Sequence, residues 1–233
     1  MKKLLYLLFI VLLTVPAMAQ YQLDSAWFRE NYTKVETMIP MRDGVKLFTS
    51  IYIPKDTTEL HPVLMTRTPY SSAPYGEDYR QYWSNYQSNY LRENYIMVFQ
   101  DVRGRYMSEG TYMDIRPFNP DKKGNETDEA SDTYDTIDWL VKNIKGNNNR
   151  VGVFGISYPG FYSTMAALSG HPSLKAVSPQ APVTEWFIGD DFHHNGAFFQ
   201  LDAFAFYKRF GVPRPYPIKE YKGGYEFTGS DNY

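Results

Sequence analysis

The sequence predicts an α/β fold in which a mostly parallel sheet carries helices on both faces. Apolar, β-branched runs of strand length alternate with segments of helical periodicity, and glycine or proline falls at their boundaries. One strand-like run also passes through a sharp, glycine-bounded turn directly into a helix-like run. Because such sheets bind ligands at the carboxyl ends of their strands, residues that follow strands are the first candidates for function.

The first half of the chain supplies four expected strands. They are residues 35–41, 45–53, 63–67 and 96–101. The Asp43-Gly44 step between the first two indicates an antiparallel hairpin, and Pro69 ends the third. The tyrosine- and asparagine-rich run 79–95 predicts a helix before the fourth.

In the second half, apolar residues at helical spacing predict a helix that Gly146 ends. These residues are Ala130, Tyr134, Ile137, Val141 and Ile144. A loop at 147–149 leads to the expected strand 150–154, the helix 161–169 that closes at Gly170, and the strand 174–177. A final helix is expected from about residue 195 to residue 209.

The charged stretch 119–132 is predicted to be a solvated loop that runs into a helix. A calcium loop is the alternative, but the acidic residues lack its alternating ligand spacing.

Composition narrows the function classes. The 233 residues are 43% hydrophobic and 17% aromatic, which fits one globular domain, and the net charge of −2 offers no basic patch for nucleic acid. The absence of cysteine excludes disulfides, thiolate metal sites and a cysteine nucleophile. No metal or organic cofactor is expected, and association into a homo-oligomer stays open.

The N-terminus predicts a signal peptide over residues 1–19. Lys2 and Lys3 precede an apolar run, and Ala17-Met-Ala19 has the small-residue pattern of a cleavage site. A membrane-spanning helix is the alternative, but the run is shorter than the ~20 residues needed. We therefore expect export to a bacterial periplasm or the exterior, without a stable membrane anchor.

The turn Gly155-Ile-Ser-Tyr-Pro-Gly160 joins the strand 150–154 to the helix 161–169. In α/β hydrolases such a turn exposes a nucleophilic serine and aims the helix N-terminus at the charge of the transition state, so Ser157 is the candidate nucleophile. Gly155 and Gly160 are expected where a Cβ has no room, although the common motif has its second glycine one residue earlier. A merely flexible turn is the alternative.

Four ordered motifs carry a resemblance to a known superfamily. They are Arg67-Thr-Pro-Tyr70, Gln100-Asp-Val-Arg-Gly-Arg105 with Ser108-Glu-Gly110, Tyr134-Asp-Thr-Ile-Asp-Trp139 and Gly155-Ile-Ser-Tyr-Pro-Gly160. From about Thr37 onward the chain resembles the cocaine esterase, X-prolyl dipeptidyl peptidase and α-amino acid ester hydrolase superfamily. The segment 189–198 looks most like the α-amino acid ester hydrolases. The resemblance implies an α/β-hydrolase fold.

The resemblance also implies roles for particular residues. Ser157 is the nucleophile, and the backbone N–H of Tyr158 and the hydroxyl of Tyr70 are the oxyanion donors. Asp191 binds the α-ammonium group of the substrate, and the adjacent Asp190 stays open for the same role. The alternatives are that Tyr70 is a surface tyrosine and that the two aspartates cap the last helix. Asp101, Arg103 and Arg105 are expected to be scaffold, and Trp139 to be core.

The histidine base and its acid are missing from this pattern. His61 and His171 are expected at the surface, and His193 and His194 lie close to the aspartates in sequence. The hydrolase order is serine, acid, then histidine, which places both partners beyond Tyr233. We expect residues 20–210 to be the first part of the hydrolase domain, incomplete at its C-terminus, and residues 211–233 to begin a truncated cap domain. The chain alone is expected to be inactive.

The predicted function is therefore a secreted serine hydrolase that cleaves or transfers α-amino acyl esters or amides. Its substrate is a small molecule or short peptide with a free α-amino group. The alternatives are an X-prolyl dipeptidyl peptidase and an inactive truncated protein or pseudoenzyme.

Overall fold

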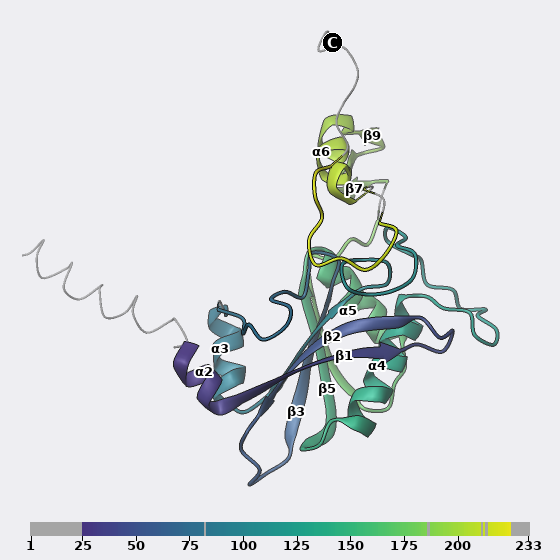
Figure 1. Ribbon diagram of the computed structural model, residues 1–233. Helices are drawn as coiled ribbons and strands as arrows, with labels where there is room; N and C mark the ends of the chain where they lie inside the picture. The colour runs from purple at the N-terminus through teal and green to yellow at the C-terminus, as the bar shows by residue number, and fades with distance from the viewer. Residues whose placement is uncertain (1–24, 82, 186, 211, 213, 225–233) are drawn as a thin grey trace, which may run out of the picture.

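A six-stranded sheet with helices on both faces forms the centre of the computed structural model (Figure 1), which describes residues 25–224 apart from 82, 186, 211 and 213. The strand order is β1-β2-β4-β3-β5-β6, and β2 runs against its neighbours while β4, β3, β5 and β6 are parallel. The expected fold class is thus confirmed. The predicted signal peptide, residues 1–19, lies outside the described residues. Both ends of the predicted cap segment, residues 211 and 233, also lie outside them.

The strands of this sheet are β1 (Tyr32–Pro40), β2 (Lys46–Pro54), β3 (His61–Thr68), β4 (Ile96–Asp101), β5 (Asn147–Ile156) and β6 (Leu174–Gln180). The helices are α2 (Ser25–Asn31), α3 (Asn85–Arg92), α4 (Glu129–Asn143), α5 (Tyr158–Leu168) and α6 (Gln200–Phe210). Three short strands, β7 (Gly189–Asp190), β8 (His193–His194) and β9 (Ala197–Phe198), form a second sheet before α6.

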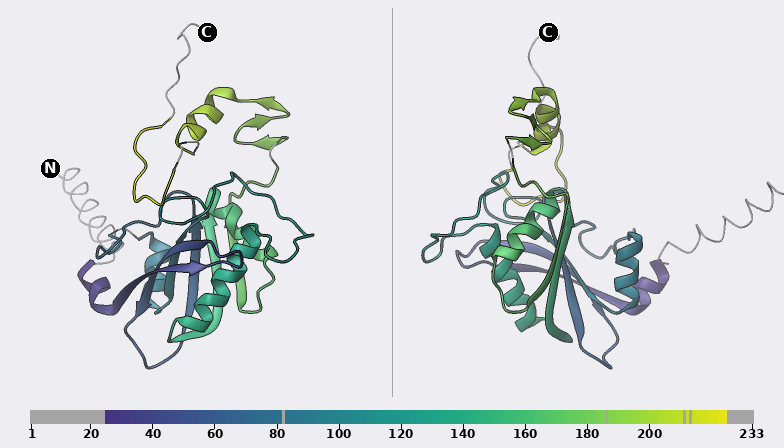
Figure 2. Two further views of the ribbon diagram at one scale, coloured as in Figure 1. Left: turned by 45° about the vertical axis from the view of Figure 1, so that its right-hand side comes forward. Right: turned by 180° about the vertical axis from the view of Figure 1, so that it is seen from behind.

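Two cores lie on opposite faces of the sheet. Helices α4 and α5 cover one face and α2 and α3 the other (Figure 2). The first core is aliphatic and includes Ile51, Val98 and Ile137, whereas the second is aromatic and includes Phe28, Tyr52 and Trp83. Burial on both faces explains why the central strand β4 begins with a continuous apolar run, whereas the edge strand β6 is largely exposed.

Two helices are shorter than predicted. Helix α3 begins only after Ser84, whose backbone N–H donates to the Gln87 side chain (3.0 Å) and so caps the first turn. Helix α6 begins at Gln200 because Asn195 and Gly196, with φ of 49° and 83°, form the two-residue turn between β8 and β9. The loop predicted at 147–149 is instead the start of β5.

The charged stretch does run into a helix, but its last acids are not solvated. Asp128 caps α4 by accepting from the Ser131 N–H (2.8 Å), and Asp128, Glu129 and Asp132 are buried. They form ion pairs with cationic side chains: Lys122, Arg67, Arg103 and Arg116. The strand-end arginines face the start of α4, so these carboxylates neutralise buried guanidinium groups.

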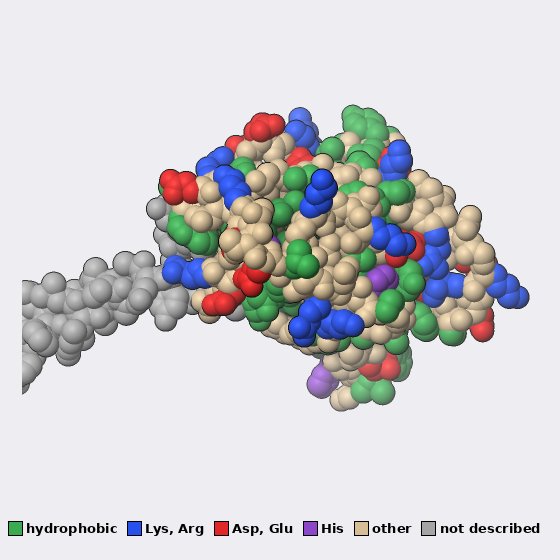
Figure 3. Space-filling model, turned by 90° about the horizontal axis from the view of Figure 1, so that it is seen from below, with side chains coloured by type: hydrophobic (Ala, Val, Ile, Leu, Met, Phe, Trp, Pro, Cys, Tyr) green, Lys and Arg blue, Asp and Glu red, His purple; other side chains and the backbone are tan. Residues whose placement is uncertain are grey.

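The small sheet and α6 lie above the carboxyl ends of the main strands (Figures 1 and 2). On the opposite side of the molecule, basic and acidic side chains are interspersed with apolar ones (Figure 3). No helix in the described part of the chain has the length and apolar character needed to cross a membrane.

Candidate active site

Three neighbouring parallel strands deliver the candidate residues to one edge of the sheet. Strands β4, β3 and β5 lie side by side and end at Asp101, Thr68 and Ile156. Tyr70 lies two residues beyond the end of β3, and Ser157 directly follows the end of β5. Residues far apart in the sequence therefore meet at the position where α/β sheets bind ligands.

Ser157 occupies a strained turn between β5 and α5. Its φ and ψ are 64° and −124°, a region that costs a residue with a Cβ about 1–3 kcal/mol. Its N–H donates to the Gln180 carbonyl (2.9 Å), and its carbonyl accepts from the Phe161 N–H (3.1 Å). Ser157 is exposed, so its hydroxyl is accessible.

The expected lack of room at both glycines is confirmed. A Cβ on Gly155 would lie 2.2 Å from the Pro159 carbonyl oxygen, and one on Gly160 would lie 2.4 Å from that of Gln180. Gly160 therefore lets the first turn of α5 approach the end of β6. This contact accounts for a glycine three residues after Ser157 rather than two.

The Tyr70 side chain reaches the same turn. Its ring lies edge-on to those of Tyr158 and Phe210, with centroids 6.2 Å and 5.8 Å away. Burial raises the pKa of the Tyr70 phenol, and a hydrogen bond with the Ser157 side chain opposes the rise. The phenol is thus neutral near pH 7, is 43% exposed, and lies beside the serine hydroxyl.

Tyr158, the residue after Ser157, is buried and begins α5. Its backbone N–H is one of the first-turn groups that have no partner within a helix. Its hydroxyl donates to Asp114 Oδ1 (2.7 Å) and accepts from the Ile115 N–H (2.7 Å), while the Tyr112 hydroxyl lies 2.6 Å away. Burial raises the pKa of both phenols.

Asp114 is the centre of this network and was not among the predicted residues. Besides Tyr158, it accepts hydrogen bonds from Tyr112 at Oδ1 (3.1 Å) and from Tyr207 of α6 at Oδ2 (2.6 Å). It thereby joins α6 to the start of α5. Asp114 lies in an irregular loop, where no periodic pattern marks it.

Asp190 and Asp191 lie in the β7–β8 hairpin, in which Asp190 pairs with His193. The alternative that they cap the last helix is wrong, because α6 begins about ten residues later. The negative charge of Asp191 raises the pKa of Tyr70, which places this carboxylate within electrostatic reach of the candidate site. The side chain of Asp190 lies outside the described part.

The prediction that His61 and His171 are surface residues is also wrong, since they are 2% and 6% exposed. His61 begins β3 and His171 follows α5, so both lie at the opposite end of the sheet from Ser157. His193 packs against Phe187 and Phe198 in the small sheet. Among the described residues, no hydrogen bond joins a histidine to Ser157.

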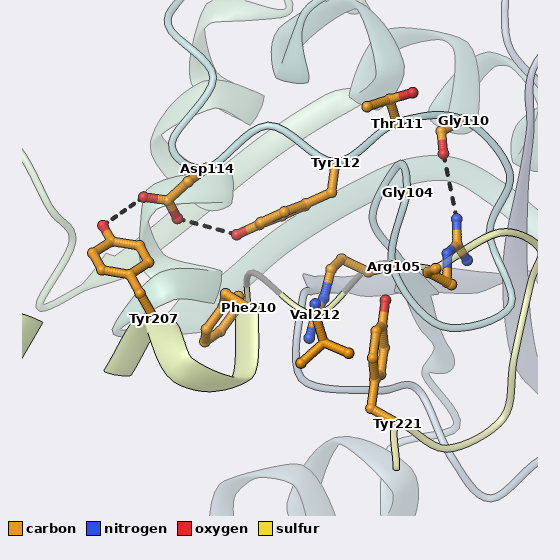
Figure 4. A pocket seen from close by; sticks show the side chains of 11 residues that line it. Gly104, Arg105, Gly110, Thr111, Tyr112, Asp114, Tyr207, Phe210, Val212 and Tyr221 are labelled. Atoms are coloured by element: carbon orange, nitrogen blue, oxygen red, sulfur yellow. Dashed lines mark hydrogen bonds between the residues drawn. The ribbon is translucent and has the colours of Figure 1, made fainter. Parts of the chain in front are cut away.

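A cavity of about 400 Å³ opens between the 104–114 loop and the segment that follows α6 (Figure 4). The Arg105 guanidinium lies between the rings of Phe210 and Tyr221, with centroids 4.7 Å and 4.3 Å away. Tyr112 and Asp114 line this cavity, whereas Ser157 does not. No cluster of potential metal ligands occurs in the described ranges.

The chain is similar to known proteins over most of its length. The profile of the X-Pro dipeptidyl-peptidase (S15) family matches residues 43–214. A cocaine esterase from Rhodococcus sp. is 36% identical over 145 residues, which are 61% of this chain and 22% of the esterase.

Two solved structures are also similar. An α-amino acid ester hydrolase is 38% identical with a TM-score of 0.72, over 85% of this chain and 32% of that one. An aminopeptidase from a marine sediment Thaumarchaeota archaeon is 40% identical with a TM-score of 0.70, over 86% and 32%. The chain therefore spans a third or less of the length of these relatives.

Proposed function

Because the chain belongs to the X-Pro dipeptidyl-peptidase (S15) family of α/β-hydrolases, we propose that it carries the nucleophile side of a serine hydrolase site for α-amino acyl esters or amides. The observation that supports this proposal is the meeting of the Tyr70 phenol and the Ser157 hydroxyl at a strained, exposed turn. The proposal assigns two oxyanion donors, the Tyr70 hydroxyl and the Tyr158 N–H, to a position beside this nucleophile, because acyl transfer requires such donors.

In the proposed reaction the Ser157 oxygen attacks the acyl carbon and forms an ester, and the alcohol or amine departs. The Tyr70 hydroxyl and the Tyr158 N–H hold the oxyanion, and loss of one such donor typically costs about 3 kcal/mol of the barrier. Water or an amine then releases the acyl group. The histidine base and its acid are contributed from outside the described residues.

Substrate recognition in this proposal depends on the β7–β8 hairpin. A carboxylate within electrostatic reach of the oxyanion donor, Asp191, offsets the desolvation of an α-ammonium group as it approaches Ser157. An X-Pro dipeptidyl peptidase is the second candidate, favoured by the description of the matched family. We further propose that residues 1–19 direct export.

The test is covalent labelling of the protein purified from its natural source. A fluorophosphonate probe should modify Ser157, as located by peptide mass spectrometry, and Ser157→Ala should abolish the adduct. Esters with a free α-amino group should react faster than their N-acetylated forms. An unlabelled Ser157 in folded protein would contradict the proposal and favour a non-catalytic protein.

A further inference from the structure

A buried carboxylate lies beneath the loop that carries Tyr70. Asp101 ends β4, next to the end of β3, and is 0% exposed. Within the described part of the chain it forms no ion pair, unlike the nearby Asp132, which pairs with arginines. A buried charge without a counter-ion is costly and persists only where hydrogen bonds stabilise it.

The hydrogen bonds of Asp101 point mainly to that loop. Oδ1 accepts from the Ser72 N–H (2.7 Å), and Oδ2 accepts from the Tyr75 hydroxyl (2.9 Å). The Met107 N–H also donates to Oδ2 (3.2 Å). Two of the three donors therefore belong to the loop that starts immediately after β3, and they lie two and five residues beyond Tyr70.

The loop needs such support because its backbone is strained. Ser71, which follows Tyr70, has a φ of 105°, a value that residues with a Cβ rarely adopt. Strain of this kind persists only where the surroundings fix the chain. The Ser71 hydroxyl is 2.8 Å from the Tyr75 hydroxyl. Tyr75, which donates to Asp101, therefore also holds the strained Ser71 in place.

Hydrogen bonds also fix the backbone just before Tyr70, and one of them comes from Arg105, four residues after Asp101. The Pro69 carbonyl accepts from Nε of Arg105 (3.1 Å), and the Tyr70 N–H donates to the Thr68 hydroxyl (3.0 Å). With Arg105 on one side and Asp101 on the other, the backbone of Tyr70 is held on both sides. We infer that Asp101 is a positioning residue that holds the Tyr70 hydroxyl against the Ser157 turn; its role in catalysis rests on the proposed function.

The first test observes Tyr70 directly and needs no activity. A 3-fluorotyrosine placed at position 70 of the full chain should give a ¹⁹F resonance that shifts or broadens in Asp101→Asn, because an amide cannot accept at both positions. Tyr75→Phe removes one hydrogen bond but keeps the carboxylate, so it should shift the resonance less. This variant still tests the inference if Asp101→Asn does not fold. Asp138→Asn, on the outer side of α4, is the matched control. An unchanged Tyr70 resonance in Tyr75→Phe and Asp101→Asn overturns the inference.

The second test separates positioning from general stability in the active protein. Tyr70→Phe should lower kcat about a hundredfold, and Asp101→Asn about tenfold with KM nearly unchanged, because the donor acts on the transition state. In the Tyr70→Phe background, Asp101→Asn should then have less than about a twofold further effect. An equal loss in both backgrounds overturns the inference. If Ser157→Ala and Tyr70→Phe leave activity intact, the proposed function fails, and the resonance still reports on positioning.

Discussion

The sheet and the small hairpin region above it are packed in different ways. In the sheet region, Tyr70 and Ser157 follow the ends of buried strands, and the turn around Ser157 has no space for an extra methyl group. In the region from residue 187 to the end of α6, large apolar side chains are exposed, namely Phe187, Ile188, Phe198, Phe199, Leu201 and Phe204. The groups proposed for chemistry thus lie on a rigid scaffold, whereas the group proposed for substrate recognition lies on a loosely packed element.

This difference suits the two tasks. Oxyanion stabilisation loses its effect when a donor moves by a fraction of an ångström, so the donors belong on packed elements. A carboxylate that attracts an ammonium group tolerates more movement, because charge attraction falls off slowly with distance. One link between the regions is the Asp114 carboxylate, which accepts hydrogen bonds from Tyr158 below and Tyr207 above, and the packing of Phe210 against Tyr158 is another.

The largest expected effect is a difference in unfolding free energy when a glycine is replaced by alanine in each of the two regions. Gly155→Ala should destabilise the protein by about 3 kcal/mol, because its Cβ would meet the Pro159 carbonyl at 2.2 Å. Gly189→Ala in β7, where a Cβ meets nothing within 4 Å, should change stability by less than about 0.5 kcal/mol. Urea unfolding of the two variants measures both values. Equal losses would mean that the hairpin region is as tightly packed as the turn.

A smaller effect concerns the buried carboxylate of Asp101 in the sheet region, which forms hydrogen bonds but, among the described residues, no ion pair. Burial raises the pKa of Asp101 to about 6, above the usual value of 3.8. Between these values the folded state binds more protons than the unfolded state, so this group favours folding increasingly as the pH falls through 6.

From pH 7.5 to pH 5, wild type should therefore gain about 1 kcal/mol relative to Asp101→Asn, which does not titrate there. Urea unfolding of the two proteins at both pH values tests this expectation. A constant difference between them would show that Asp101 is not protonated in this range.

The smallest effect tests the link between the regions. Tyr207→Phe removes the hydrogen bond to Asp114 and should cost about 0.5–1 kcal/mol. Hydrogen exchange should become faster in α6 and stay unchanged in β3 and β5. Tyr216→Phe, at a side chain that is 66% exposed, is the control. Faster exchange throughout the sheet would show that the two regions unfold as one unit.

The sequence allowed prediction where the determinants are local. The order of strands and helices follows from periodicity, and the turn at Ser157 follows from a six-residue pattern whose glycines the structure explains. The Asn195-Gly196 step was an available signal for a hairpin, but the surrounding residues suit a helix as well.

Other features depend on contacts between distant residues. Asp114 meets Tyr158 and Tyr207 across 44 and 93 positions, and nothing near Asp114 in the sequence marks those contacts. The burial of His61 and His171 was missed for the same reason, since a single residue at the edge of an element has no period.

The phenols around Asp114 give the protein an optical property. The chain has 21 tyrosines, and burial raises the pKa of Tyr112, Tyr158 and Tyr162. In an alkaline titration followed by ultraviolet absorbance, the exposed phenols ionise first and reversibly. These three ionise only when the surrounding chain opens, because water must reach them. Tyr32 and Tyr75, whose pKa burial also raises, ionise in the same late step, so this step reports, without any added label, the pH at which the buried parts of the protein open.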